Sequence, residues 1–395
     1  MLANLPPRIR ARADRFHSVR VGREWGGRMI LHGKRKPSGA IEVDSNDYLA
    51  LTGDTRITGA MREALVSGAT LASGVFLHGE HPQLRLENDL ATFLDAPAGV
   101  LCQSGLEANV GLLQAICDAE TPVYIDYLAH MSLWQGAKLA GAPIHPFRHN
   151  DAEQLRDRVD EYGPGVIAVD SLYSTNGSRA PLVELCAVAA DTGSVLVVDE
   201  SHTLGIYGPD GAGLVVEENL ADRVHFRTAS LSKAFGGRAG FITAPDREFA
   251  DYFKMESYPA IFSSTLQPHD IAGLAAALAV IRGADQRRSR LREVGARLRN
   301  GLRHMGFDLE DSVGQIIPVL GGPEQRTMAV RDLLEEHNVF GSVFCAPATS
   351  QDRAIIRLSL HAALTDDDVD QILTACRTVR DTLGARPPAR LRRAS

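Results

Sequence analysis

The stretch GVIAVDSLYSTNGSRAPLVELCAVAADTGSVLVVDES, residues 165–201, decides the fold class. Two short apolar runs, VIAV and VLVV, lie on either side of a helix-length segment that begins at Pro181. A run that is apolar at every position is typical of a strand buried on both faces, as in a parallel sheet covered by helices. The stretch therefore predicts a strand–helix–strand unit of the α/β class.

The same alternation continues on both sides of this unit. VLCQSG precedes LEANVGLLQAICD, PVYIDY precedes LAHMSLWQGAKLAG, and VHFRTASLSK follows residue 201. We expect a central, mostly parallel sheet with helices on both faces, which binds its ligand beyond the carboxyl ends of the strands. Several polar residues fall at or just after these predicted strand ends: Ser104, Asp126, His130, Asp170, Ser174, Asp199, His202 and Lys233.

The pattern also predicts how the chain is divided. Residues 1–45, rich in Arg, Gly and Pro, are expected to form an N-terminal arm, and 46–284 a large ligand-binding domain. In 285–383 the predicted strands are fewer and more loosely interleaved with helices, which indicates a small C-terminal α+β domain. Residues 384–395 are expected to be a disordered basic tail.

Composition excludes several classes of protein. The net charge is −7, which argues against a nucleic-acid partner. No apolar run approaches the roughly 18 residues that span a membrane. The N-terminus lacks the apolar core of a secretory signal, so we expect a cytoplasmic protein. The 13 histidines form no metal-ligand cluster, and no metal is expected.

Lys233 lies in TASLSKAFGGRAG, residues 228–240, and only five of the 42 Lys and Arg residues are lysines. An arginine stays protonated and forms no imine, whereas a lysine amine can attack a carbonyl. Most lysines are simply surface charges. Here the neighbours are small residues that supply hydroxyls and allow close approach, as a phosphate site requires: Ser230, Ser232, Gly236 and Gly237.

Two further segments carry candidate chemistry. Asp199 ends an apolar run, where it is either a cap of the strand end or a partner for a cationic ring nitrogen. His202, three residues later, is close enough to serve the same ligand. Ser104-Gly105 begins a predicted helix whose free amides suit a phosphate, although many helices begin in this way.

Together the three segments specify pyridoxal 5′-phosphate (PLP). This cofactor needs a lysine for its aldehyde, an acid opposite its pyridine nitrogen and a cup for its phosphate. His130 could stack on the ring, or it could be a histidine at a helix N-terminus in a polar cleft. The local sequence leaves both interpretations of His130 open.

The order of several motifs resembles that of the α-oxoamine synthases, a branch of the fold-type I, aspartate-aminotransferase-like PLP enzymes. The motifs are QSGLEAN, DYLAHMSL, DSLYSTNGSRAPL, DESHTLGIYGPDGAG, SLSKAFGG and IIRLSL, and the resemblance covers roughly residues 40–380. Within that family the chain is most similar to the quorum-sensing autoinducer synthases. The stretches that carry this finer likeness include SNDYLALTGD, ADRVHFRTASLSKAF, AIFSSTLQPHDIAGL and VFGSVFCAPAT.

The resemblance implies a role for each candidate. Lys233 would form the imine and act as base, Asp199 would pair with the pyridine nitrogen, and His130 would stack on the ring. The remaining cofactor contacts it implies are His202 and Ser174 at the phenolic oxygen, and Ser104, Gly105, Leu106 and Ser230 or Ser232 at the phosphate. Ser264 would reach the phosphate of the neighbouring subunit, which implies a homodimer. Asn46 and Arg357 would hold the substrate carboxylate, although a strand arginine such as Arg357 could equally face solvent.

The activity implied is condensation of a small amino acid, of the 2-aminobutyrate or S-adenosylmethionine type, with a medium- or long-chain acyl-CoA. Coenzyme A and CO2 would leave, giving an α-aminoketone precursor of an α-hydroxyketone autoinducer. The alternatives are an 8-amino-7-oxononanoate synthase or glycine C-acyltransferase, and an aminotransferase of the same fold. Glycine-using members usually have two glycines where this chain has Arg238-Ala239, and often an aromatic residue where it has Leu106, and both differences argue against a biotin-pathway or haem-pathway enzyme. The Arg-Ala pair agrees with the autoinducer branch.

Overall fold

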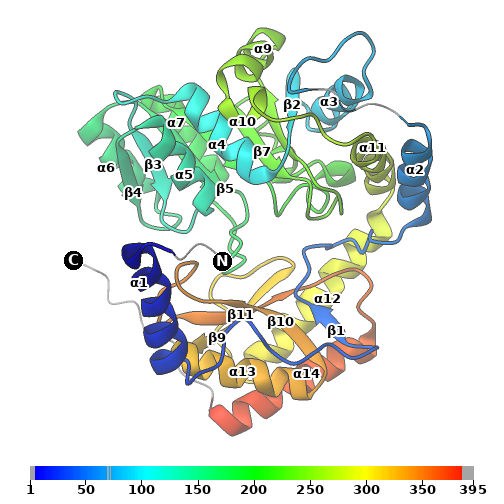
Figure 1. Ribbon diagram of the computed structural model, residues 1–395. Coiled ribbons are helices and arrows are strands. Elements are labelled where there is room, and N and C mark those ends of the chain that lie inside the picture. Colours follow the sequence, from blue (N-terminus) through cyan, green and yellow to red (C-terminus); the bar gives the residue numbers. More distant parts are fainter. Residues whose placement is uncertain (1–4, 69–70, 72, 385–395) are drawn as a thin grey trace.

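A computed structural model describes residues 5–68, 71 and 73–384 and contains two sheets (Figure 1). The larger sheet has the strand order β2-β8-β7-β6-β5-β3-β4. Strand β8 is antiparallel to both of its neighbours, and the other adjacent pairs are parallel. The bounds are β2 (Ala98–Cys102), β3 (Val123–Asp126), β4 (Ile144–Phe147), β5 (Val166–Asp170), β6 (Val195–Asp199), β7 (Phe226–Ser230) and β8 (Gly240–Ala244).

Helices cover both faces of this sheet, because its strands are apolar on both sides. On β2, Leu101 packs into the same core cluster as Leu274 of α11 (Pro268–Arg282). Its neighbour Val100 packs into a second cluster with Leu112 of α4 (Gly105–Ile116). The second cluster also includes residues of α5 (Met131–Ala140), α6 (Ala152–Tyr162), α7 (Leu182–Thr192) and α9 (Arg247–Glu256). The predicted helix-covered, mostly parallel sheet is confirmed.

The smaller sheet has the order β1-β10-β11-β9, with bounds β1 (Ile41–Val43), β9 (Ile316–Gly322), β10 (Val339–Phe344) and β11 (Ala354–Ser359). Three helices belong to this part of the chain: α12 (Asp285–His304), α13 (Glu324–Glu336) and α14 (Asp366–Leu383). Thr365 begins α14 with a capping box that also uses Asp368. The predicted small α+β part is confirmed.

The N-terminal segment expected as an arm contributes to the smaller sheet. Its strand β1 lies parallel to β10, and Ile41 pairs with Val339. Before β1 come α1 (Pro7–Arg15) and the π-helical η1 (Phe16–Glu24). We retain the domain bounds 1–45, 46–284, 285–383 and 384–395 as a proposal, and residues 385–395 of the expected tail lie outside the described residues.

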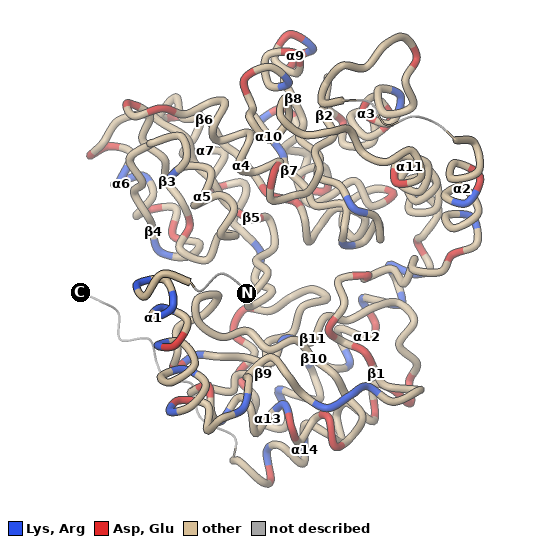
Figure 2. The backbone as a smooth tube through the Cα atoms, viewed as in Figure 1, with Lys and Arg blue, Asp and Glu red and all other residues tan. Residues whose placement is uncertain are grey.

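Sequence reasoning did not predict every element. Strand β8 is only five residues long and directly follows the glycine-rich loop, so its apolar run is easily taken for part of that loop. The other unpredicted elements are α1, η1 and β1 of the expected arm, and β4, α6, α9, α2 (Thr55–Val66), α3 (Pro82–Phe93), η2 (Pro209–Gly211), α8 (Leu214–Glu217) and α10 (Tyr258–Ile261). Basic and acidic residues are mixed along the backbone, both around the larger sheet and around the smaller one (Figure 2). Among the described residues, no helix is long and apolar enough to cross a membrane.

Candidate active site

The carboxyl ends of the parallel strands meet at a cavity of about 230 Å³. It is lined by Ser104, Gly105, Leu106, Asn109, His130, Asp170, Asp199, Ser201, His202, Ser230, Ser232 and Lys233. Nine of these are residues that the sequence analysis named for the cofactor. The parallel topology brings them together, because each follows the carboxyl end of a strand or begins the helix after it.

Lys233 follows β7, and its amine points to the imidazole of His202. The Nζ atom lies 3.2 Å from His202 Nε2. Burial, and after it the charge of Arg357, lowers the pKa of the Lys233 amine, against the opposing effect of Asp199 and Asp170. A lowered pKa increases the neutral fraction of the amine, which is the form that reacts with a carbonyl.

Asp199 ends β6 and is only 5% exposed. Its Oδ1 accepts from the backbone N–H of Ser201 at 2.8 Å, so the carboxylate does cap the strand end. Its Oδ2 accepts from the side-chain amide of Asn109 at 2.7 Å. One carboxylate thus both caps the strand and faces the cavity, and the two interpretations of Asp199 are compatible. Asn109 was missed, although it is the asparagine of the QSGLEAN motif.

His130 lies at the N-terminus of α5. Its Nδ1 accepts from the backbone N–H of Ser132 at 3.3 Å, so the ring caps the helix. Its own backbone N–H donates to Asp170 Oδ1 at 3.0 Å. Burial lowers the pKa of His130, and burial together with the charge of Asp199 raises the pKa of Asp170 well above its ordinary range. The ring that caps α5 also lines the cavity, so neither interpretation of His130 excludes the other.

One corner of the cavity is built to hold an anion. Ser104 Oγ caps α4 by accepting from Glu107 N at 3.2 Å, and the other first-turn amides of a helix have no acceptor within it. Gly105 packs directly on Ser230, where an added Cβ would lie 2.5 Å from the Ser230 Cβ. The hydroxyls of Ser230 and Ser232 are 2.8 Å apart. Amides and hydroxyls at a helix N-terminus suit a phosphate.

Arg357 projects from β11 and is 4% exposed, so it does not face solvent. Its Nη2 donates to Asn46 Oδ1 at 2.8 Å, and its Nη1 donates to the backbone carbonyl of Ser174 at 3.0 Å. Its Nε has no hydrogen-bond partner, and no carboxylate pairs with the guanidinium among the described residues. A buried cation without a counter-ion is suited to bind a carboxylate.

Tyr48 connects the arginine side of the site to the lysine side, and sequence reasoning missed it. Its Oη lies 2.6 Å from His202 Nδ1 and 3.2 Å from Asn46 Oδ1. The tyrosine is fully buried. Its motif, SNDYLALTGD, supported only a family resemblance, and nothing local indicated that this tyrosine reaches His202, 154 residues away.

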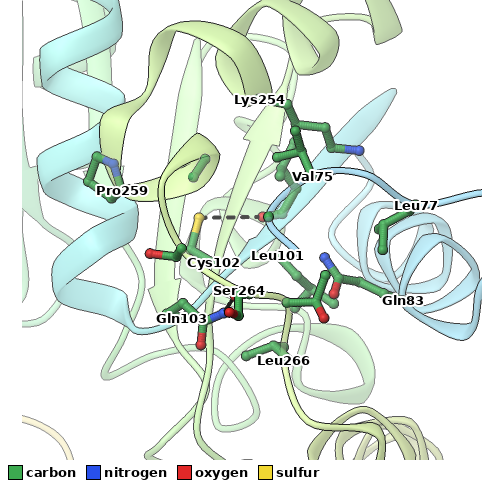
Figure 3. Close-up of a pocket in the computed structure, with 15 residues that line it drawn as sticks. Val75, Leu77, Gln83, Leu101, Cys102, Gln103, Lys254, Pro259, Ser264 and Leu266 are labelled. Atoms are coloured by element: carbon green, nitrogen blue, oxygen red, sulfur yellow. Dashed lines mark hydrogen bonds between the residues drawn. The ribbon is translucent and has the colours of Figure 1, made fainter. Parts of the chain in front are cut away.

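Two of the residues predicted to bind the cofactor are not among those that line the cavity, and neither are the predicted carboxylate-binding residues Asn46 and Arg357. Ser174 contacts Arg357 through its backbone carbonyl and is not among the residues that line the cavity. Ser264 is exposed and lines a smaller cavity beside β2, where its carbonyl accepts from the Gln103 side chain (Figure 3). Within the part of the chain that the structure describes, no group of three His, Cys, Asp or Glu residues could hold a metal ion.

Comparisons with known proteins agree with this arrangement. The family model described as aminotransferase class I and II matches residues 38–375. The CAI-1 autoinducer synthase of Vibrio campbellii is 44% identical over 94% of this chain and 95% of its own length. A putative 8-amino-7-oxononanoate synthase of Geobacillus kaustophilus is 32% identical over 87% of this chain and 89% of its own.

Solved structures show the same fold. One described as "SPT with PLP", a variant form, superposes with a TM-score of 0.84 at 24% identity and covers 96% of this chain and 98% of its own. The chain therefore belongs to the aminotransferase class I and II family, and its relatives there place it among the PLP-dependent α-oxoamine synthases.

Proposed function

We propose that this chain is an acyltransferase that condenses a small amino acid with a medium- or long-chain acyl-CoA, with PLP as cofactor. The observation that carries the proposal is the buried Lys233 amine beside His202, in a cavity that also holds Asp199 and an anion-binding corner. That donor set fits PLP: an amine for the aldehyde, a carboxylate for the pyridine nitrogen, and amides with hydroxyls for the phosphate. When bound, PLP supplies a ring that withdraws electrons from the amino-acid Cα.

The residues of this chain would do the rest of the work. Lys233 would hold the cofactor at its aldehyde carbon and later remove the proton from the amino-acid Cα. Its lowered pKa favours the neutral amine that such a base needs. Asp199, fixed by Asn109 and Ser201, would keep the pyridine nitrogen protonated. His130 would pack on the ring, and His202 would face its phenolic oxygen.

Arg357 and Asn46 would bind the carboxylate of the amino acid. The free Nε edge of a buried guanidinium offers a directional contact, which fixes the Cα bond that stands perpendicular to the ring. The new carbon–carbon bond would join Cα to the acyl carbon as coenzyme A leaves, and loss of CO2 would give the α-aminoketone. Ser104, Gly105, Leu106, Ser230 and Ser232 would hold the phosphate.

The similarity to the autoinducer synthase of Vibrio campbellii, at 44% identity, supports the autoinducer branch. For that branch the motif resemblance implies an amino acid of the 2-aminobutyrate or S-adenosylmethionine type and a product that is an α-hydroxyketone precursor. Arg238-Ala239 after the lysine motif supports the same branch. The second candidate is 8-amino-7-oxononanoate synthesis, favoured by the relatives that are 32% identical. We also propose that the enzyme is cytoplasmic, because its proposed substrate acyl-CoA is available there.

We also propose a homodimer whose site is shared between subunits. Ser264 lies away from this chain's cavity and is exposed, as expected of a residue that reaches the partner's phosphate. Large apolar side chains nearby are also exposed, among them Tyr258 (62%) and Phe262 (80%). A second subunit would cover them.

One experiment decides between the candidate functions. The purified holoenzyme is offered a panel of amino acids, each with acetyl-, pimeloyl-, octanoyl- and decanoyl-CoA, and the products are identified by mass spectrometry. We expect an α-aminoketone from 2-aminobutyrate or S-adenosylmethionine with octanoyl- or decanoyl-CoA. A preference for alanine with pimeloyl-CoA would establish the second candidate, and cofactor conversion to its amine form without a thioester would indicate an aminotransferase.

A separate measurement tests the assignment of the lysine. Borohydride reduction of the holoenzyme should attach the cofactor covalently to Lys233, as read by peptide mass spectrometry. Lys233→Gln should lose this label and its activity, by at least about 10²–10⁴-fold. Lys138→Gln, on the solvent side of α5, is the control and should keep both. A label on Lys254 or Lys138 in the wild type would overturn the assignment.

A further inference from the structure

We propose that Tyr48 is a positioning residue that sets the tautomer of His202 and so couples the carboxylate-binding pair, Asn46 and Arg357, to Lys233. The catalytic role of Tyr48 rests on the proposed function, whereas the hydrogen-bond arrangement around His202 does not. It concerns a hydrogen-bonded chain of side chains that runs from one side of the site to the other.

The hydrogen-bonded series of side chains has four contacts. Lys233 Nζ lies 3.2 Å from His202 Nε2, and His202 Nδ1 lies 2.6 Å from Tyr48 Oη. Tyr48 Oη lies 3.2 Å from Asn46 Oδ1, which also accepts from Arg357 Nη2 at 2.8 Å. The five residues come from four separate parts of the sequence: Asn46 and Tyr48, His202, Lys233, and Arg357. Tyr48 is the member that joins the two halves.

Counting hydrogens decides the direction of these bonds. Asn46 Oδ1 has no hydrogen, so its contact with Tyr48 requires the phenolic proton. Tyr48 Oη must then accept from His202, which places the single proton of the neutral imidazole on Nδ1. The bare Nε2 is left to accept from Lys233. With this assignment each of the four contacts has one donor hydrogen and one acceptor.

The side chains at the centre of this hydrogen-bonded series are buried, so water cannot take the place of their partners. Tyr48 is 0% exposed and His202 is 4% exposed, so neither side chain can exchange its partner for bulk water. Gln315 closes the same region, because its side-chain amide donates to the His202 carbonyl at 2.7 Å. The tyrosine hydroxyl can both donate and accept, which a phenylalanine in the same space cannot do. Removing that one atom therefore separates His202 from Asn46 without removing the ring that fills the core.

The test uses Tyr48→Phe and reads the imidazole directly. Nitrogen-15 chemical shifts of histidine-labelled, cofactor-free protein distinguish the two tautomers, and His202→Gln identifies the His202 signals. We expect His202 of the wild type to be mainly the Nδ1–H tautomer, and Tyr48→Phe to shift it toward Nε2–H. A wild type that is mainly Nε2–H, or a Tyr48→Phe spectrum unchanged at His202, would overturn the proposal.

Tyr124→Phe is the matched control. Tyr124 is also fully buried, and its hydroxyl donates to the Gly163 carbonyl, before the amino end of β5 and away from the cavity. Both variants lose the hydroxyl of a buried tyrosine and its hydrogen bonding, but Tyr124→Phe should leave the His202 signals unchanged. Equal changes at His202 in both variants would show a general structural effect and would also overturn the proposal.

Kinetics of the holoenzyme give the second readout. In Tyr48→Phe we expect the KM for the amino acid to rise about tenfold, the order of one lost hydrogen bond to a positioning group, with the KM for acyl-CoA unchanged. Equal rises in both KM values would contradict the coupling. Failure of the proposed function is distinguishable, because a wild type that forms no aminoketone leaves the tautomer result in cofactor-free protein intact.

Discussion

The side-chain amide of Asn109 donates to Asp199 Oδ2 at 2.7 Å, while its oxygen accepts from Thr228 Oγ1 at 2.5 Å. A second N–H of the same amide donates to Ser132 Oγ at 2.8 Å. Asn109 is 1% exposed, so these partners are not replaced by water. One amide on α4 thereby joins α5, β6 and β7 and holds the carboxylate that we assign to the pyridine nitrogen.

Asn109→Ala should weaken both the fold and cofactor binding. The change leaves Asp199 Oδ2 and Thr228 Oγ1 buried without this partner, which costs about 1–3 kcal/mol of the free energy of unfolding. A carboxylate that is no longer held should raise the dissociation constant for PLP about tenfold. Urea denaturation and absorbance titration measure the two effects. Asn300→Ala, at an exposed position on α12, is the control, and an unchanged PLP affinity in Asn109→Ala would contradict the assignment.

Gly105→Ala should damage the anion-binding corner. The added Cβ would lie 2.5 Å from the Ser230 Cβ and 2.8 Å from its Cα, so α4 and β7 must move apart. We expect a loss of about 1–3 kcal/mol in the free energy of unfolding, with weaker binding of PLP and of inorganic phosphate. Gly59→Ala on α2 is the matched control. No atom lies within 4 Å of its added Cβ, so it should be neutral or stabilise the helix by up to about 1 kcal/mol.

Arg357→Lys should reduce binding of the amino acid specifically. A lysine keeps the positive charge but cannot contact Asn46 and the Ser174 carbonyl in the same planar geometry. We expect the KM for the amino acid to rise about 10–100-fold, the effect of one to two charged hydrogen bonds, with a much smaller change for acyl-CoA. Arg353→Lys, at the residue directly before β11 and paired with Glu310, serves as control. Similar KM values for wild type and Arg357→Lys would exclude the carboxylate role.

Stability of the cofactor-free protein should fall in acid partly through His202. Burial, then the charges of Lys233 and Arg357, lowers the pKa of His202 well below its ordinary value of 6.5. Below about pH 6.5 the unfolded chain therefore binds a proton at this residue that the folded protein does not bind. The contribution is intact above pH 6.5 and is lost as the pH falls, by up to about 1.4 kcal/mol per pH unit.

The measurement is urea denaturation at pH 7.5, 6.5 and 5.5 for wild type and His202→Gln. The variant should lose less free energy of unfolding between pH 6.5 and 5.5 than the wild type does. His78→Gln, at an exposed position, should follow the wild type. Parallel curves for wild type and His202→Gln would show that His202 does not titrate differently on folding.

Much of the site could be read from the chain because it depends on local order. Lys233, Asp199, His202 and the Ser104-Gly105 turn each follow a predicted strand directly, and the carboxyl ends of parallel strands converge on one edge. The apolar runs identified those strands without any tertiary information. The antiparallel β8 was missed because its five residues directly follow the glycine-rich loop and are easily taken for part of it.

The sequence by itself determined the α/β class, the cofactor chemistry and which strand ends carry it, since periodicity and residue type are local properties. Only the tertiary structure decided that Tyr48 reaches His202, that Asn109 holds Asp199, and that Arg357 is buried against Asn46 and not exposed. These contacts join residues 90 to 311 positions apart. They form where separate elements pack together: α4 against the end of β6, the segment after β1 against β11, and that same segment against the residues after β6. A hydrogen bond between such elements leaves no periodic trace in the chain.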